Sequence, residues 1–435
     1  MSALRFAYRG AASALDAAAR ARVFDRATSG DAALRTRVAA LLAEVRRDGD
    51  AALRRFAEHF DGARLDALEV PRAEWTAALE ALDPDLRRVM TRAAANIRDV
   101  HAAFRPVARE TVTADGVVIG RRPDPLSRVG VYAPGGRAAY PSSVLMGAVP
   151  ARVAGVGEVI LCSPPGADGR PSAVVLAAAA LAEVDRVFAI GGAGAIAAMA
   201  YGTASVPVVD RIVGPGNAYV AEAKAQVASA VAIDSPAGPS ELLVLADATA
   251  DATVLARELV AQAEHDPVAA VVLVTDAPAL ADAVVAALAA RIDAEPRAAI
   301  VRDALAARGA IVIVDTLDAG IAFSNAWAPE HLLLVVRREA EQGILDRLRH
   351  AGTIFVGAQA SVAFGDYLSG ANHVLPTGGA ARGYSGLSTL DFVRWTTYQR
   401  IGPATAAALA DDTGRFADAE GLPGHAAAAR QWSRR

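Results

Sequence analysis

Short apolar runs alternate with helical stretches rich in small residues between residues 128 and 209, and this alternation limits the possible folds more than any other feature. The run V-G-V-Y-A-P-G-G ends in a glycine-proline loop, and E-V-I-L-C-S and R-V-F-A-I-G-G follow it as further strand-like runs. Alanine-rich stretches of helical length separate these runs. Strands that alternate with helices in this way predict a parallel sheet with right-handed crossovers.

A second block of the same kind occupies residues 236–380. Its expected strands are E-L-L-V-L-A-D, A-A-V-V-L-V-T-D, A-R-G-A-I-V-I-V-D and H-L-L-L-V-V. We therefore expect an α/β protein with two incomplete Rossmann-like parallel-sheet domains, at residues 109–235 and 236–380, between helical N-terminal and C-terminal segments.

The two ends of the chain have a helical pattern. Residues 1–108 carry apolar side chains three and four residues apart, as at Val38 and Leu42, and we expect these amphipathic helices to pack on the main domain. The run T-V-T-A-D-G-V-V-I that follows alternates about an Asp-Gly pair, which predicts a hairpin. Residues 381–435 are expected to form a helical tail, with one helix near residues 390–399.

Charge and cysteine content exclude several classes of protein. The net charge of -4 gives no basic field, so we expect no nucleic-acid partner. The single cysteine, Cys162, excludes a disulfide framework, and its apolar run is typical of a buried strand thiol. The N-terminal residues lack the apolar core of a secretory signal, and the uncharged stretch 187–209 contains four glycines and Pro207, which argues against a membrane span. We expect a cytoplasmic protein.

Histidines and carboxylates gather between Trp327 and His373. Glu330 and His331 are adjacent and follow a proline. A carboxylate can deprotonate water and a neutral imidazole can accept a proton from an alcohol near pH 7, so this pair is a candidate for acid/base catalysis. Standing alone, such a dipeptide would more often be a hydrated turn.

A possible metal site combines residues from separate parts of the chain. Gln262 and His265 are three apart near the end of an expected helix, so their side chains share one face. With Asp366 and His373 they offer nitrogen and oxygen ligands without a thiolate, a set that suits Zn²⁺ but also Mn²⁺ or Co²⁺. The Gln-x-x-His spacing by itself also arises from core packing.

Three glycine-rich loops are suited to binding a polar ligand. In G-G-A-G-A-I-A, Gly194 holds the second glycine position of the dinucleotide fingerprint, and Asp210 follows at the spacing of a ribose-binding acid, although helix packing explains the glycines equally well. The loops V-G-P-G-N-A-Y-V and D-S-P-A-G-P-S-E add backbone N–H groups, Asn217 and Ser240. Lys224, the only lysine, has either a specific role or a place on a solvated helix face.

Seven stretches of the chain together resemble the histidinol dehydrogenase family. They are V-G-V-Y-A-P-G-G, G-P-G-N-A-Y-V-A-E-A-K, I-D-S-P-A-G-P-S-E, Q-A-E-H, W-A-P-E-H-L, S-G-A-N-H-V-L-P-T-G and A-E-G-L-P-G-H, in the family's order over about residues 110–425. The resemblance implies a zinc-dependent homodimer of histidine biosynthesis that oxidises L-histidinol to L-histidine through L-histidinal and reduces two NAD⁺. It also implies that residues 109–235 form the NAD side and residues 236–380 carry the metal and acid/base residues.

The resemblance also implies a role for individual residues. The metal ligands would be Gln262, His265, Asp366 and, from the other subunit, His425. The catalytic acid/base pair would be Glu330 and His331. The substrate would be lined by Ser240, Gln262, His265, His331, Asp366, His373, Glu420 and His425. NAD⁺ would be contacted by Tyr132, Gly194 and Asn217. The tail 381–435 would then be exchanged between subunits, so that each active site is shared.

At Gly194 the chain departs from the family, which commonly has glutamine in a G-G-A-Q-A motif. Either the backbone approaches the cofactor more closely at this position or one NAD contact is missing.

Two other functions are compatible with the same residues. A zinc hydrolase would use Glu330 to activate a metal-bound water and would not need NAD. A metal-sensing or structural dimer would use the histidine, aspartate and glutamine side chains only to fasten the tail.

Overall fold

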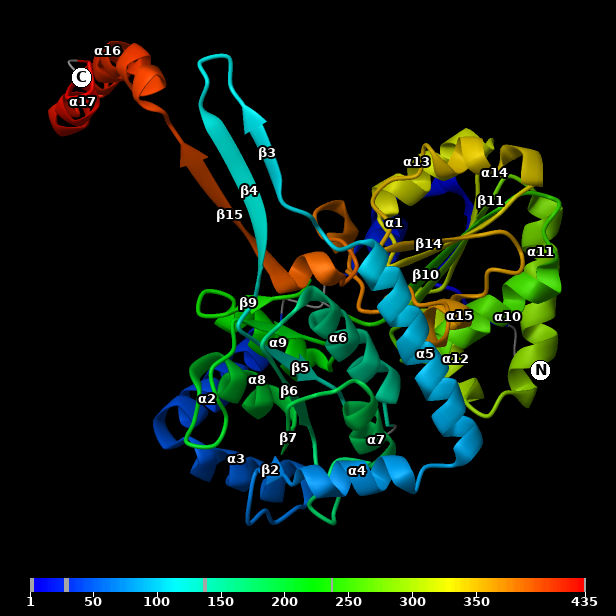
Figure 1. The fold of residues 1–435 in the computed structure, drawn as a ribbon. Helices are drawn as coiled ribbons and strands as arrows, with labels where there is room; N and C mark the ends of the chain where they lie inside the picture. Colours follow the sequence, from blue (N-terminus) through cyan, green and yellow to red (C-terminus); the bar gives the residue numbers. More distant parts are fainter. Residues whose placement is uncertain (1–3, 27–30, 136–138, 236–237, 434–435) are drawn as a thin grey trace.

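A computed structural model describes residues 4–26, 31–135, 139–235 and 238–433. Within these ranges the strands form two six-stranded sheets and one three-stranded sheet (Figure 1). Both larger sheets are mainly parallel and covered by helices on both faces, so the predicted α/β class is confirmed.

The first sheet has the order β2-β7-β6-β5-β8-β9 and is parallel except for β2. Its strands are β2 (Glu69–Val70), β5 (Arg128–Tyr132), β6 (Glu158–Ser163), β7 (Arg186–Ala189), β8 (Arg211–Val213) and β9 (Ala232–Ile233). The helices that follow its strands are α6 (Pro141–Ala154), α7 (Ala173–Leu181), α8 (Gly192–Tyr201) and α9 (Ala218–Val227). Helices α6 and α7 pack together, as do α8 and α9.

The second sheet has the order β1-β12-β11-β10-β13-β14 and is parallel throughout. Its strands are β1 (Tyr8–Ala11), β10 (Glu241–Ala246), β11 (Ala270–Thr275), β12 (Ala310–Ile313), β13 (His331–Val335) and β14 (Thr353–Val356). One face carries α10 (Ala252–Ala263), α11 (Pro278–Arg291) and α12 (Ala298–Arg308). The other face carries α1 (Ala17–Phe24), α13 (Leu317–Trp327) and α14 (Arg338–Leu345), and α15 (Val362–Tyr367) follows β14.

The N-terminal residues are shared between the two sheets. The helices here are α2 (Ala32–Asp48), α3 (Asp50–Phe56), α4 (Arg72–Glu80) and α5 (Pro84–Ala103), and residues Ala57–Asp61 form a π-helical turn. Strand β1 pairs with β12 of the second sheet, and β2 pairs with β7 of the first. The predicted helical segment 1–108 therefore also contributes one strand to each of the two six-stranded sheets. Short 3₁₀ turns lie at Ala12–Ala14, Ile292–Ala294, Ala380–Arg382 and Thr389–Phe392.

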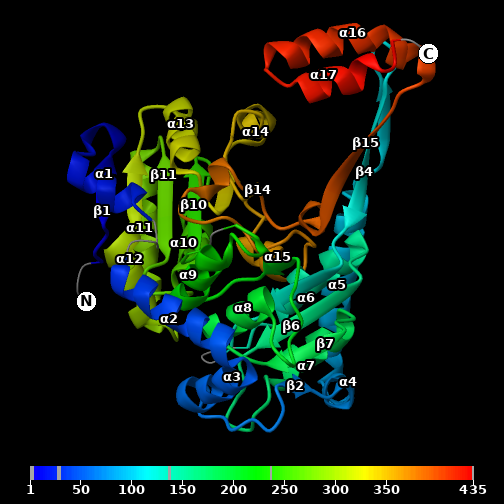
Figure 2. The same ribbon diagram turned by 90° about the vertical axis from the view of Figure 1, so that its left-hand side faces the viewer.

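An arm projects from the body and carries the C-terminus (Figures 1 and 2). The predicted hairpin is confirmed as β3 (Arg109–Val112) and β4 (Val118–Pro125), and β15 (Val393–Arg400) joins it in antiparallel register. Helices α16 (Pro403–Ala419) and α17 (Pro423–Arg430) pack on each other at its end. The helix expected near residues 390–399 is wrong, because the β-branched and aromatic side chains of V-R-W-T-T-Y-Q-R favour the strand that β4 accepts.

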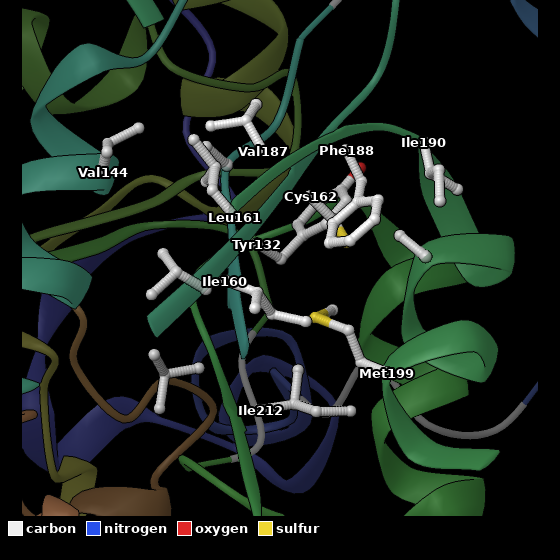
Figure 3. Close-up of a cluster of buried hydrophobic side chains, with 14 of the residues drawn as sticks. Tyr132, Val144, Ile160, Leu161, Cys162, Val187, Phe188, Ile190, Met199 and Ile212 are labelled. Atoms are coloured by element: carbon white, nitrogen blue, oxygen red, sulfur yellow. The ribbon is translucent and has the colours of Figure 1, made fainter. Parts of the chain in front are cut away.

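The strands of the first sheet and the helices packed against them form a continuous apolar core, part of which is drawn in Figure 3. Cys162 lies fully buried within it, and burial raises the pKa of its thiol far above the ordinary value. The predicted buried strand thiol is therefore confirmed. The uncharged stretch 187–209 is β7, α8 and their connections, and none of the helices in the described residues has the length and apolarity needed to cross a membrane.

Candidate active site

The adjacent residues Glu330 and His331 lie at the amino end of β13, between β10 and β14. Only 8% of the Glu330 side chain and 5% of the His331 side chain are exposed, so the hydrated-turn interpretation is wrong. A left-handed residue, Ala328 with φ of 56°, turns the chain into this segment after α13. The side chains of Glu330 and His331 therefore enter the interior directly after the turn at Ala328.

Glu241 holds this pair through its backbone. Its N–H donates to Glu330 Oε2 at 2.7 Å, and its carbonyl oxygen lies 3.0 Å from His331 Nδ1. A carbonyl can only accept, so Nδ1 carries the proton in that bond. The other ring nitrogen, Nε2, is then the basic position of a neutral imidazole, and it lies 3.8 Å from Asp366 Oδ1.

The charge state of His331 depends on its acidic neighbours. Burial disfavours its charged form, but the carboxylates of Glu330 and Asp366 outweigh this and raise the pKa of His331 to about 9. A cation bound by Asp366 would offset part of that attraction and leave a better proton acceptor near pH 7.

Asp366 and His373 complete the group around His331. Asp366 lies on α15, and its carbonyl oxygen is 2.9 Å from His373 Nδ1. Burial lowers the pKa of His373, which also feels the charges of Asp366, His331 and Glu330. The structure therefore brings four of the predicted residues together from the sequence interval 330–373.

Gln262 and His265 stand at the end of α10, beside α15. Glu258 of α10 accepts a hydrogen bond at 3.1 Å from the first N–H of α15, which joins the two helices. Gln262 is buried, whereas His265 lies just beyond the helix and is exposed. Tyr367, the last residue of α15, feels the charges of Asp366 and Glu264, which places the two helix ends close together.

The residues present fit a divalent metal. The side-chain nitrogen of Gln262 is buried without a hydrogen-bond partner in the described structure, and a reversed amide would present an oxygen ligand there instead. Among the described residues no three His, Cys, Asp or Glu side chains gather as a metal site. Of the four metal ligands that the resemblance implies, only His265 and Asp366 are His, Cys, Asp or Glu residues of the body. A further ligand from the arm, His425, is consistent with this arrangement.

Glu420 and His425 are not brought to this group within one chain. Glu420 is the C-terminal cap of α16, and His425 lies on α17. Both are exposed, and their helices stand at the end of the arm, away from α15 and from β10 and β14, the neighbours of β13 (Figure 2).

A cavity of about 340 Å³ is lined by Pro239 and Glu241, the two neighbours of Ser240 in the chain. It runs from the loop after β8, at Gly216 and Asn217, to the start of β10 at Glu241. Ser240 directly precedes Glu241 and is partly exposed. Residues 236 and 237 of the third glycine-rich loop, like residue 136 of V-G-V-Y-A-P-G-G, lie outside the described residues.

Tyr132 and Asn217 lie at carboxyl ends of the first sheet, where open α/β sheets bind ligands. Tyr132 ends β5; its oxygen accepts from the Gly192 N–H at 3.1 Å, and burial raises its pKa to about 12. Asn217 is exposed and caps α9. The backbone of Gly214 (φ 117°) passes so close to Tyr132 that an added Cβ would lie 2.1 Å from its carbonyl oxygen, which explains the glycine.

One expectation on the NAD side is wrong, and the NAD role of Gly194 stays a prediction. Asp210 lies at the amino end of β8, and its carboxylate accepts from the Ser127 and Arg128 N–H groups at 2.8 and 2.9 Å, so the ribose interpretation is wrong. The sequence spacing matched, but the residue is at the opposite edge of the sheet. Gly194 is buried in α8, and an added Cβ would lie 3.0 Å from the Phe56 ring.

Lys224 has a specific structural role, and the solvated-face alternative is wrong. It is buried, forms an ion pair with Asp234 and donates to the Gly214 carbonyl at 3.1 Å. Asp234 in turn accepts from the Gly214 N–H at 2.8 Å. Lys224 and Asp234 therefore hold the G-P-G-N loop in place through both backbone groups of Gly214.

Sequence reasoning missed Glu241 and Asp61. Glu241 belongs to the motif that was noted only for Ser240, and its contacts to the acid/base pair run mainly through its backbone. Burial raises the pKa of Asp61 to about 6, and this carboxylate acts on the phenol of Tyr132. Its position before Gly62 carried no sequence signal for a site.

Comparison with known proteins gives one consistent result. The model of the family described as histidinol dehydrogenase matches residues 24–432. A histidinol dehydrogenase of Methanosarcina mazei is 46% identical over 390 residues, 89% of each chain. One from Xanthomonas axonopodis pv. citri is 48% identical over 418 residues, 95% of this chain and 96% of its own. The crystal structure of histidinol dehydrogenase from Elizabethkingia anophelis superposes with a TM-score of 0.93 at 33% identity, covering 99% of this chain and 98% of that one.

Proposed function

This chain belongs to the histidinol dehydrogenase family, and on that premise we propose that it oxidises L-histidinol to L-histidine through L-histidinal at the site built around Glu330 and His331. The observation that carries the proposal is the buried pair itself, fixed by both backbone groups of Glu241. NAD⁺ would supply the hydride acceptor for both oxidations.

His331 is the base of the first oxidation. Its Nδ1 proton is directed to the Glu241 carbonyl, which leaves Nε2 free to accept the proton of the substrate alcohol as hydride departs. The nearby Asp366 carboxylate then stabilises the imidazolium that forms.

Glu330 is the base of the second oxidation. Oxidation of an aldehyde requires addition of water before the second hydride can leave, and a carboxylate at this position can take the water's proton. Cys162 is fully buried in the first domain, which removes a thioester route from consideration.

Gln262, His265 and Asp366, together with His425 from a second chain, would hold zinc. Bound zinc would supply a fixed positive charge that orients the imidazole and amino nitrogens of histidinol. The unpartnered amide of Gln262 and the nitrogen and oxygen donor set support this assignment.

We also infer a homodimer with exchanged arms. The arm ends in exposed apolar side chains, with Phe416 72% and Leu422 41% exposed. On α15, Phe364 and Tyr367 are 59% and 58% exposed. Apolar surfaces of this kind on the arm and beside the site support burial between two chains, which would deliver Glu420 and His425 to the partner's substrate.

The rival functions receive no support. The family model, the two relatives and the crystal structure named above are all described as histidinol dehydrogenase, which gives no support to a hydrolase. A metal site that only fastens the tail does not account for the burial of Glu330 and His331 in the body.

The test is the number of NADH molecules formed per histidinol consumed, before and after chelation. Two NADH, abolished by chelator and restored by Zn²⁺, is the expected result. One NADH with release of the aldehyde would remove the role of Glu330, and no NADH would reject the proposal.

A further inference from the structure

A buried arginine from the N-terminal segment lies against the turn that precedes the acid/base pair. Arg26 follows α1, and its guanidinium lies 3.5 Å from the centre of the Trp327 ring. It also donates to the Trp327 carbonyl oxygen, while the Trp327 indole N–H donates to the Val23 carbonyl at 2.9 Å. Arg26 is 5% exposed and Trp327 is fully buried, so this contact is an interior one.

The same guanidinium reaches the residue that holds the acid/base pair. Arg26 Nη1 lies 2.5 Å from Glu241 Oε2. That carboxylate accepts from the Glu330 N–H at 3.4 Å, and its other oxygen accepts from the Gly378 N–H at 2.8 Å. Through its backbone, Glu241 also holds the Glu330 carboxylate and the His331 ring. Arg26 therefore contacts the segment 327–330 directly at Trp327 and, through Glu241, at Glu330.

The segment between these two contacts has an unfavourable backbone conformation. Ala328 has φ of 56° and ψ of 70°, the left-handed region that a side chain disfavours. Such a conformation persists where the surroundings determine it on both sides, and it is common at active sites. Here Trp327 is held by Arg26 and Glu330 by Glu241.

We propose that Arg26 and Glu241 form a positioning pair, a clamp that fixes the orientation of Glu330 and His331 for proton transfer without touching substrate. The inference rests on the proposed acid/base roles of Glu330 and His331. Arg26 offsets the charge of a second carboxylate beside Glu330. Glu241 then holds the Glu330 N–H through that carboxylate, and the Glu330 carboxylate and His331 ring through its backbone.

The pKa values of Glu241 and Arg26 agree with these two roles. Burial raises the pKa of Glu241 to about 7 even though the Arg26 charge opposes the shift, so its ionisation depends on that guanidinium. Burial lowers the pKa of Arg26 to about 10, which still leaves it charged at neutral pH. Loss of Arg26 would leave Glu241 as an uncompensated buried carboxylate that takes up a proton and weakens its hold on the Glu330 N–H.

The cavity beside the pair makes a sharp experiment possible. Arg26 and Glu241 both line the cavity of about 340 Å³, which also has the exposed Asn217 and Val268 in its wall. Truncation of Arg26 would therefore leave a space that a small cation can enter from solvent beside the Glu241 carboxylate.

Chemical rescue of Arg26→Ala in the full-length enzyme tests the clamp. We expect kcat for histidinol and for histidinal to fall about 10- to 100-fold, with much smaller changes in the two KM values, because orientation is lost rather than binding. Guanidinium at non-denaturing concentration should restore kcat, whereas urea, a neutral molecule of the same shape, and sodium chloride at equal ionic strength should not. Arg20→Ala, which removes an exposed arginine from α1, is the matched control and should keep wild-type kcat.

Two results would overturn the clamp. The first is wild-type kcat in Arg26→Ala, and the second is equal rescue by urea and guanidinium, which would show that only volume is missing. Should Arg26→Ala not fold, Glu241→Gln is measured in the same way, since it keeps the shape and an acceptor for the Gly378 N–H. A fall in kcat that guanidinium does not reverse supports the proposal, and unchanged kcat overturns it. A Glu330→Gln variant measured in parallel separates the two claims, because full activity there would reject the acid/base assignment itself.

Discussion

The candidate site residues of the body are buried close together, whereas those of the arm are exposed. In the body, Glu330, His331, Asp366 and His373 lie together, held by backbone hydrogen bonds and largely shielded from solvent. On the arm, Glu420 and His425 are exposed, and their helices α16 and α17 stand at its end, away from α15 (Figure 2). The body thus contains the acid/base machinery, while the arm carries polar residues whose place in the site requires a second chain.

This difference indicates how the two parts should respond to substitution. Changes in the body should alter the chemical steps, since each side chain there is fixed relative to His331. Changes on the arm should alter substrate and metal binding and should depend on which chain of a dimer carries them.

The largest effect is expected for Glu330→Gln. Loss of the water-activating base should slow oxidation of histidinal on the order of 10³-fold and oxidation of histidinol much less. Stopped-flow measurement of NADH from each substrate separates the two steps. Glu339→Gln, an exposed glutamate on α14, is the control. An equal loss in both steps would count against the proposed role.

A smaller effect is expected for His425→Ala. Removal of one metal donor should weaken zinc binding about 100-fold and reduce activity at limiting zinc, with partial recovery in excess zinc. Zinc affinity can be followed by competition with a chromophoric chelator. His350→Asn removes another exposed histidine at a positive φ that asparagine tolerates, and it should change nothing. Unaltered zinc affinity in His425→Ala would remove the arm from the metal site.

The smallest effect is expected on the NAD side of the body. At Gly194 a glutamine side chain would press on Phe56, so Gly194→Gln should cost about 1–3 kcal/mol in urea unfolding. Adding Phe56→Ala should recover part of this stability. The KM for NAD⁺ should change a few-fold, which corresponds to a free energy on the order of 1 kcal/mol. Arm variants should leave this KM unaltered. No change in that KM for Gly194→Gln would exclude position 194 from the cofactor site.

Much of the body could be predicted because buried parallel strands have near-continuous apolar sequences. Strands β6, β10 and β11 are buried along nearly their whole length, and the runs that predicted them are uninterrupted. Pairings between distant segments were not predictable. Nothing in residues 8–11 indicates that they lie beside β12. Likewise, residues 393–400 form the strand β15 because they pair with β4.

The candidate site divides in the same way. Glu330 and His331 were recognisable as an adjacent acid and base, and the family motifs predict their distant partners. Arg26 and Glu241 could not be recognised from the sequence, because their contacts to the pair depend on tertiary packing and largely on backbone atoms. Asp210 shows the converse case, in which a correct spacing led to the wrong edge of the sheet.

Hybrid dimers test the shared site most directly. Glu330→Gln and His425→Ala homodimers, each nearly inactive in histidinal oxidation at limiting zinc, would be unfolded together, refolded and assayed for histidinal oxidation. Random pairing gives hybrids in about half of the dimers, and each hybrid has one site with both residues intact, so activity should return to about a quarter of wild type. Activity no greater than the sum of the two parents would show that body and arm do not form one site across two chains.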